Sequence, residues 1–165
     1  MITLGIDPGT AITGYGLVCE QDDRLVLVDC GVITTTAGQA LPLRLQTIYR
    51  GLTDVVHRFQ PGVAAVEELF FSRNARTALA VGHARGVTLL ALADAGLPIA
   101  EYKPMQVKQA IAGYGGADKQ QVQEMVRLLL DLDHVPQPDD AADAVAIAIC
   151  HIHAARMAEL LVGST

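Results

Sequence analysis

Four acidic residues stand at positions from which they could act together. Asp7 and Glu67 each follow a short apolar run that has the length of a buried strand. Asp140 and Asp143 are three residues apart at the start of a helical pattern, so they would share one helix face. Because sites in open α/β sheets form at the carboxyl ends of strands, Asp7 and Glu67 would lie at such an edge.

Carboxylates gathered in one place repel one another, and either a proton or a cation must relieve that repulsion. Carboxylate oxygens are hard ligands that suit Mg²⁺ or Mn²⁺. Two such ions about 3.5–4 Å apart can activate a water and stabilise the leaving oxygen in phosphodiester hydrolysis. The four residues therefore favour a metal-dependent phosphodiesterase.

Each acid also has a structural interpretation that requires no chemistry. Asp7 could open an Asx turn, and Glu67 could lie at a solvated strand end. Asp140 and Asp143 could be ordinary first-turn acids, which the helix dipole favours, with Asp139 as the helix cap. The spacing alone does not show that the four side chains converge.

The elements that would position these residues follow from the hydrophobic pattern. Short runs rich in apolar and β-branched residues predict strands at 2–6, 14–19, 25–34, 63–66 and 98–102. Helical spacing predicts helices at 41–59, 74–95, 104–112, after a capping box that begins at Asp118, and at 139–160. This order implies one α/β domain over 1–165, with a central mixed five-stranded sheet flanked by helices and a flexible tail in the last few residues.

Composition narrows the class of protein. The chain has 165 residues, of which 51% are hydrophobic and 4% aromatic, so one aliphatic core can serve it. We see no basic leader and no run of the roughly 18 apolar residues that a membrane span needs. The 3 cysteines lack metal or disulfide spacing. A cytoplasmic protein with no membrane association is expected.

The charge is less typical of a protein that binds nucleic acid. The net charge is −6, although setting aside the four candidate site acids leaves 14 acidic residues against 12 basic ones. Six of those 12 basic residues lie between positions 73 and 119, where acids are few. They are Arg73, Arg76, Arg85, Lys103, Lys108 and Lys119. A locally basic face is therefore compatible with the acidic total.

An ordered series of motifs resembles the RuvC crossover junction endodeoxyribonucleases (Holliday junction resolvases), a family of ribonuclease H-like fold. The similarity runs from about residue 2 to 153. The motifs are Gly5-Ile6-Asp7-Pro8-Gly9-Thr10, Thr13-Gly14-Tyr15-Gly16, Val66-Glu67-Glu68-Leu69-Phe70, Asn74-Ala75, Ala84-Arg85-Gly86-Val87, Gln106-Val107-Lys108-Gln109, Lys119 and Asp140-Ala141-Ala142-Asp143-Ala144.

The resemblance implies a homodimer that binds four-way DNA junctions and makes paired symmetric nicks during homologous recombination and repair. It implies Mg²⁺ or Mn²⁺, two per active site, on Asp7, Glu67, Asp140 and Asp143. It also implies RuvA and RuvB as branch-migration partners. Some relatives carry His at the position of Asp140, Glu68 is a less usual neighbour of Glu67, and the basic tail of some relatives is absent.

Basic and aromatic residues acquire roles from the same resemblance. Lys108 and Lys119 are expected to approach the scissile phosphate, where a cation stabilises developing charge. Phe70 is expected to stack on an unpaired base, and Phe71 could share that role. Arg73 and Arg76 are further candidates for DNA contact. Without the resemblance, the lysines would be read as solvated and the phenylalanines as core.

Three other functions compete with the junction nuclease. A strand that ends in an acid and a Gly-Thr turn could cradle a nucleotide phosphate in an actin-like kinase or ATPase, but such enzymes generally need two lobes and this chain has the length of one. A ribonuclease H-like enzyme acting on RNA would use the same acids. A junction-binding protein without catalysis would not need all four acids.

Overall fold

A mixed sheet forms the centre of the computed structural model, which describes residues 1–68 and 75–162 apart from the side chains of 75–77 and 162. Within these residues, the five strands lie in the order β3-β2-β1-β4-β5. They are β1 (Ile2–Asp7), β2 (Ile12–Gln21), β3 (Arg24–Thr34), β4 (Val63–Glu67) and β5 (Ile99–Tyr102). The first three pair antiparallel, whereas β4 joins β1 and β5 in parallel.

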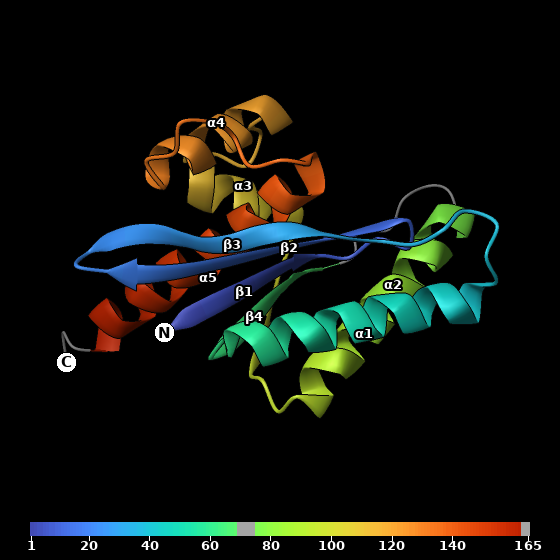
Figure 1. The fold of residues 1–165 in the computed structure, drawn as a ribbon. Coiled ribbons are helices and arrows are strands. Elements are labelled where there is room, and N and C mark those ends of the chain that lie inside the picture. Colours follow the sequence, from blue (N-terminus) through green and yellow to red (C-terminus); the bar gives the residue numbers. More distant parts are fainter. Residues whose placement is uncertain (69–74, 163–165) are drawn as a thin grey trace.

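Helices cover both faces of this sheet (Figure 1). On one side lie α1 (Leu41–Phe59) and α2 (Ala75–Asp94). On the other lie α3 (Pro104–Ala112), α4 (Lys119–Leu129) and α5 (Asp139–Val162). The expected α/β class with a mixed five-stranded sheet is confirmed.

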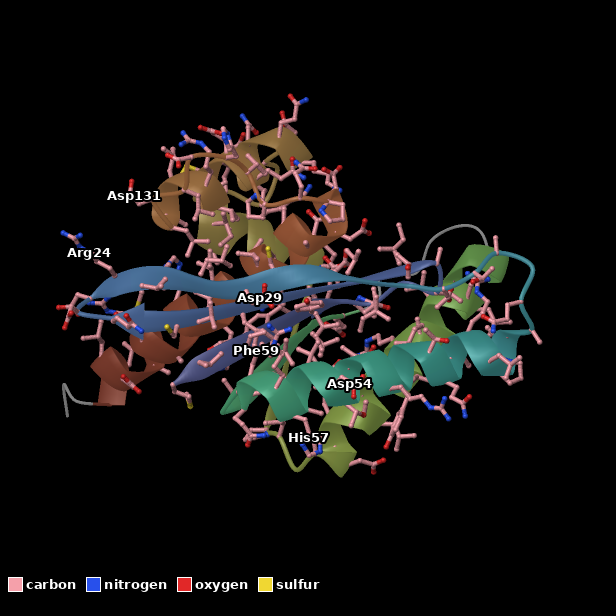
Figure 2. The ribbon with its side chains drawn as sticks, in the orientation of Figure 1. Arg24, Asp29, Asp54, His57, Phe59 and Asp131 are labelled. Carbon is pink, nitrogen blue, oxygen red and sulfur yellow. The ribbon has the colours of Figure 1, made fainter. Side chains whose placement is uncertain are left out.

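The core consists of two apolar layers that follow the alternation of side chains along each strand. In β4, Ala64 and Val66 face the α1/α2 layer, and Ala65 faces the layer under α5. Helix α1 buries Leu52 on the sheet side and leaves Asp54 and His57 exposed on its outer side (Figure 2). The aliphatic composition therefore serves two close helix–sheet contacts.

Glycines allow α5 to lie directly on the first two strands. A Cβ at Gly5 of β1 would come within 2.0 Å of the carbonyl oxygen of Ala144. A Cβ at Gly14 of β2 would come equally close, 2.0 Å, to the carbonyl oxygen of Asp140. These contacts leave no room for a side chain, so the glycines fix how near the start of α5 lies to the end of β1.

Helix α5 is also long and apolar enough, over Asp139–Leu161, to cross a membrane by length and composition alone. Counting continuous apolar runs does not reveal this property, because charged residues interrupt the helix. Its segment from Ala144 to Cys150 is buried against the sheet and the neighbouring helices. We therefore attribute the apolar character of this segment to core packing.

Candidate active site

The first two acids become neighbours through strand pairing. β1 and β4 are parallel and adjacent, with Ile6 opposite Val66. Asp7 and Glu67 are the next residues along, so both lie at the carboxyl edge of the sheet. A one-residue shift in this register would turn one of the two side chains to the other face, so the apolar pattern of the strands also sets the site.

The other two acids come from the start of α5, with Asp140 in its first turn and Asp143 just after it. Asp140 and Asp143 lie where Gly14 allows the helix backbone to touch β2, and Gly14 itself pairs with Asp7 across the β1–β2 ladder. The helix start is thus held beside the end of β1. The structure brings together the acids that the sequence could place only one by one.

One cavity of about 200 Å³ is lined by five of the six predicted catalytic residues. Three acids and both predicted lysines line it, whereas Asp140 is not part of the lining but raises the pKa of Asp7 and Asp143 through its charge. Apolar side chains form the remaining wall. The lining consists of Asp7, Glu67, Pro104, Val107, Lys108, Lys119, Val122, Asp143, Ala146 and Ile147.

Burial and mutual repulsion perturb these carboxyl groups. Burial above all, and then the charges of Glu67, Asp143 and Asp140, raise the pKa of Asp7 to about 7, although the charge of Lys119 lowers it. The pKa of Glu67 is raised mainly by burial and then by the charge of Asp143, whereas the charge of Lys108 lowers it. The site therefore holds more negative charge than its own cations neutralise.

Lys119 is the cation in closest contact with these acids. Its Nζ lies 2.9 Å from Oδ2 of Asp143 and 3.4 Å from Oδ2 of Asp139. Burial raises the pKa of Asp143 more than the hydrogen bond from Lys119 lowers it, and the same bond raises the pKa of Lys119. Asp139, expected only as a helix cap, is therefore a second partner of this lysine.

The donor chemistry of the site fits a hard divalent cation. Every acid at the cavity offers carboxylate oxygens, and Asp7 is a buried carboxyl group surrounded by like charge, which a cation would relieve. Within residues 1–68 and 75–162, however, no group of three or more His, Cys, Asp or Glu side chains is close enough to hold a metal ion in the positions that the structure gives them. The acids converge, and side-chain rotation would still be needed to complete a coordination shell.

Several predicted DNA contacts lie outside what the structure describes. Phe70, Phe71 and Arg73 belong to the segment 69–74, and the side chain of Arg76 is likewise outside the described residues. Glu68 is half-buried, and its backbone N–H donates to the carbonyl of Tyr102 at 2.8 Å. The backbone of Glu68 therefore extends the β4–β5 pairing by one residue beyond Glu67, where β4 ends.

Sequence reasoning missed two features of the cavity. One is the apolar wall that Val107 of α3 and Val122 of α4 supply, which helps to desolvate the acids. The other is the pairing of Lys119 with Asp139 and Asp143. The only available signal was the capping box at Asp118, which places the next residue at the start of a helix.

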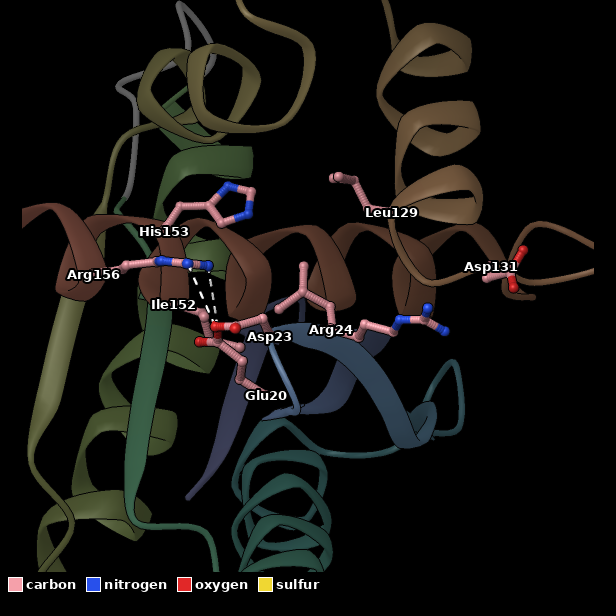
Figure 3. A pocket seen from close by; sticks show the side chains of 9 residues that line it. Glu20, Asp23, Arg24, Leu129, Asp131, Ile152, His153 and Arg156 are labelled. Carbon is pink, nitrogen blue, oxygen red and sulfur yellow. Dashed lines mark hydrogen bonds and ion pairs between the residues drawn. The ribbon is translucent and has the colours of Figure 1, made fainter.

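A larger cavity of about 470 Å³ lies at the other end of β2, beside its turn into β3 (Figure 3). Three of its charged side chains pair with one another, since Arg156 lies 3.2 Å from Glu20 and 3.6 Å from Asp23. Arg24 and Asp131 extend into the same region from opposite walls. Balanced surface charge of this kind gives no basis for catalysis.

Solved structures place the fold within a class. The yeast mitochondrial Holliday junction resolvase Ydc2 aligns with a TM-score of 0.68 at 16% identity, covering 92% of this chain and 77% of that one, a likeness of fold alone. RuvC of Thermus thermophilus, solved in complex with Holliday junction substrate, aligns with a TM-score of 0.90 at 42% identity, covering 96% of each chain. The fold is that of the ribonuclease H-like resolvases.

Sequence comparison gives the family. The family model for crossover junction endodeoxyribonuclease RuvC matches residues 3–151. Proteins of that name from Roseiflexus sp. and Chloroflexus aggregans are 61% and 63% identical over 155 residues, which is 94% of this chain and 92% and 94% of theirs. The chain belongs to the RuvC family of metal-dependent nucleases, as the motifs predicted.

Proposed function

We propose that this protein is an endonuclease that resolves four-way DNA junctions by paired symmetric nicking in homologous recombination and repair. The observation that carries the proposal is the convergence of Asp7, Glu67 and Asp143 with two lysines on one cavity. Family membership supports junction DNA as the substrate. We further propose a cytoplasmic location and RuvA and RuvB as partners, as the resemblance implies.

We propose that Asp7, Glu67, Asp140 and Asp143 hold two Mg²⁺ or Mn²⁺ ions. Bound ions of this kind supply an activated water and neutralise charge on the leaving oxygen. The protein itself supplies orientation, because β1, β4 and α5 fix the acids, and exclusion of water, because Val107 and Val122 close one side.

The two lysines act on the phosphate rather than on the acids alone. Lys108 of α3 and Lys119 of α4 line the cavity from the side opposite the sheet, so a scissile phosphate bound there would lie between cations and carboxylates. A positioned ammonium stabilises the charge that develops on a phosphate in the transition state. Phe70, Phe71, Arg73 and Arg76 remain proposed DNA contacts.

The direct test is cleavage of a synthetic mobile four-way DNA junction beside a linear duplex of the same sequence, with Mg²⁺, Mn²⁺ or EDTA. We expect paired symmetric nicks in the junction only, which EDTA abolishes. An RNA–DNA hybrid, a structured RNA and an ATPase assay in parallel address the competing functions. Preference for an RNA substrate, or ATP hydrolysis without nicking, would contradict the proposal.

The raised pKa of Asp7 predicts that metal binding depends on pH. Below pH 7 a proton occupies this carboxyl group, and a divalent cation must displace it. Affinity for Mg²⁺ is therefore expected to rise between pH 6 and pH 8, by roughly tenfold per unit below 7 and less above it. Calorimetric titration in two buffers of different ionisation enthalpy would count the protons released. An affinity independent of pH over this range would contradict the assignment of Asp7.

A homodimer would place two such sites on a two-fold junction, and we propose that α2 forms its interface. Leu79, His83, Gly86 and Leu90 follow one face of α2 at heptad spacing. Leu79 is 63% and Leu90 54% exposed, and a Cβ at Gly86 would meet nothing within 4 Å. Two exposed leucines with a glycine between them permit close approach of a second helix.

Leu90→Glu is expected to convert the dimer to a monomer at micromolar concentration, because it places a charge in an apolar contact. Sedimentation velocity would measure the change, with Leu128→Glu, an equally exposed leucine on α4 at 54%, as the control. A Leu90→Glu variant that sediments as a dimer would place the interface elsewhere.

A further inference from the structure

Lys119 occupies a fixed position at the first turn of α4. Asp118 caps this helix, with its Oδ1 accepting from the backbone N–H of Gln121 at 2.9 Å. Gln121 Oε1 in turn accepts from the backbone N–H of Asp118 at 2.9 Å and from the hydroxyl of Tyr114 at 2.7 Å. These reciprocal bonds hold the backbone beside Lys119, so that only its four-carbon side chain is free to change direction.

The ammonium group of this side chain stands among the acids of the candidate metal site. Its nearest partner is Asp143, at 2.9 Å, and the same cavity contains Asp7 and Glu67. The side chain of Lys119 is 51% exposed and that of Asp143 is 32% exposed. An ion pair so open to solvent is weak enough to exchange partners.

We propose that Lys119 is the internal counter-ion of the metal-free site, and that it competes with the divalent cation for Asp143. This inference rests on the proposed function, since it concerns the same four acids. In the metal-free protein the ammonium neutralises part of the carboxylate charge. Asp143 must release Lys119 before its oxygens serve as metal ligands, and the freed ammonium is then available to a phosphate.

Two observations indicate that Lys119 competes with the metal ion for Asp143 and does not simply assist metal binding. Asp143 is turned toward Lys119, and in the described part of the chain the acids do not form a ready coordination shell. The second lysine of the cavity, Lys108, acts instead on Glu67. The two lysines therefore act on different proposed ligands, and within the described residues Lys119, unlike Lys108, forms a direct ion pair with one of them.

Lys119→Met tests the proposal by the sign of its effect on metal affinity. Without the competing ammonium, the dissociation constant for Mn²⁺ is expected to fall about two- to fivefold, the range expected for the loss of a half-exposed ion pair. Electron paramagnetic resonance of free Mn²⁺, titrated without DNA, measures it directly. The metal-free variant is expected to melt at a lower temperature, because its carboxylates lose a counter-ion.

Two matched variants complete the experiment. Lys119→Arg keeps the charge and is expected to bind Mn²⁺ within about twofold of the wild type. Lys103→Met removes the same charge from an exposed position at the start of α3, outside the cavity, and is expected to leave affinity unchanged.

Tighter Mn²⁺ binding by Lys119→Met with slower junction cleavage at saturating metal would support both roles of the lysine. Unchanged or weaker binding would overturn the competition. If Asp7→Asn still abolished metal binding in that case, the proposed metal-dependent function would stand without it. A wild-type protein that binds no Mn²⁺ would overturn both.

Discussion

Asp7→Asn is expected to abolish junction cleavage and at the same time to stabilise the metal-free protein. The first effect follows from the loss of a buried carboxylate that lines the cavity together with Glu67 and Asp143. A loss of at least about a thousandfold in rate, or about 4 kcal/mol of transition-state stabilisation, is the scale expected for a metal ligand. Junction binding should persist, because the amide has the same size and removes only a negative charge.

The stabilising effect follows from the pKa of Asp7. In the folded protein this pKa is about 7, above its ordinary value of 3.8, so the folded state binds the proton more tightly than the unfolded state. Stability therefore falls as pH rises from about 4 to 7 and then levels off. Above pH 7, holding Asp7 ionised costs the folded state up to roughly 4 kcal/mol, and asparagine avoids that cost.

Thermal unfolding in EDTA between pH 4 and pH 8 would measure this difference. The advantage of Asp7→Asn over the wild type is expected to grow between pH 4 and 7 and to stay constant at pH 8. Asp54→Asn, which changes an exposed acid on the outer side of α1, is the matched control and should change neither activity nor stability. If Asp7→Asn were less stable than the wild type at pH 8, burial and repulsion between the carboxylates would not destabilise the metal-free protein.

The sequence predicted four acids for one site, and the structure places three of them, Asp7, Glu67 and Asp143, on one cavity. The runs before Asp7 and Glu67 read as strands, and the carboxyl ends of parallel neighbours meet at one edge. The spacing of Asp140 and Asp143 reads as one helix face. Strand order was less accessible, since pairing of β1 with both β2 and β4 depends on contacts between distant segments.

The sequence could not predict which basic side chains form ion pairs with the acids. The pairing of Lys119 with Asp143 and Asp139 depends on how α4 packs beside the first turn of α5, and that distance follows from side-chain packing across the whole layer. The motif containing Gly14 could be recognised by resemblance, but its physical role could not. That role, to let the backbone of α5 contact β2, follows from the structure alone.

Gly14→Ala is expected to damage both the fold and the site. The added methyl would lie 2.0 Å from the carbonyl oxygen of Asp140 and 2.5 Å from its carbonyl carbon, so the start of α5 must move away from β2. Overpacking of this kind costs about 1–3 kcal/mol, and more where backbone rather than a side chain must yield. A fall of about 5 °C or more in melting temperature is expected, measured by circular dichroism.

The same displacement separates Asp140 and Asp143 from Asp7, so activity should fall further than stability alone explains. Misplacement by about 1 Å can reduce an enzymatic rate about a hundredfold, and cleavage is therefore expected to fall on that scale at temperatures where the variant is fully folded. Gly116→Ala is the control, because its methyl would make only ordinary contacts of 3.6 Å with Tyr114. A Gly14→Ala variant that is folded and fully active would mean that the acids do not depend on this contact, and that the position of α5 is set by the rest of its buried face.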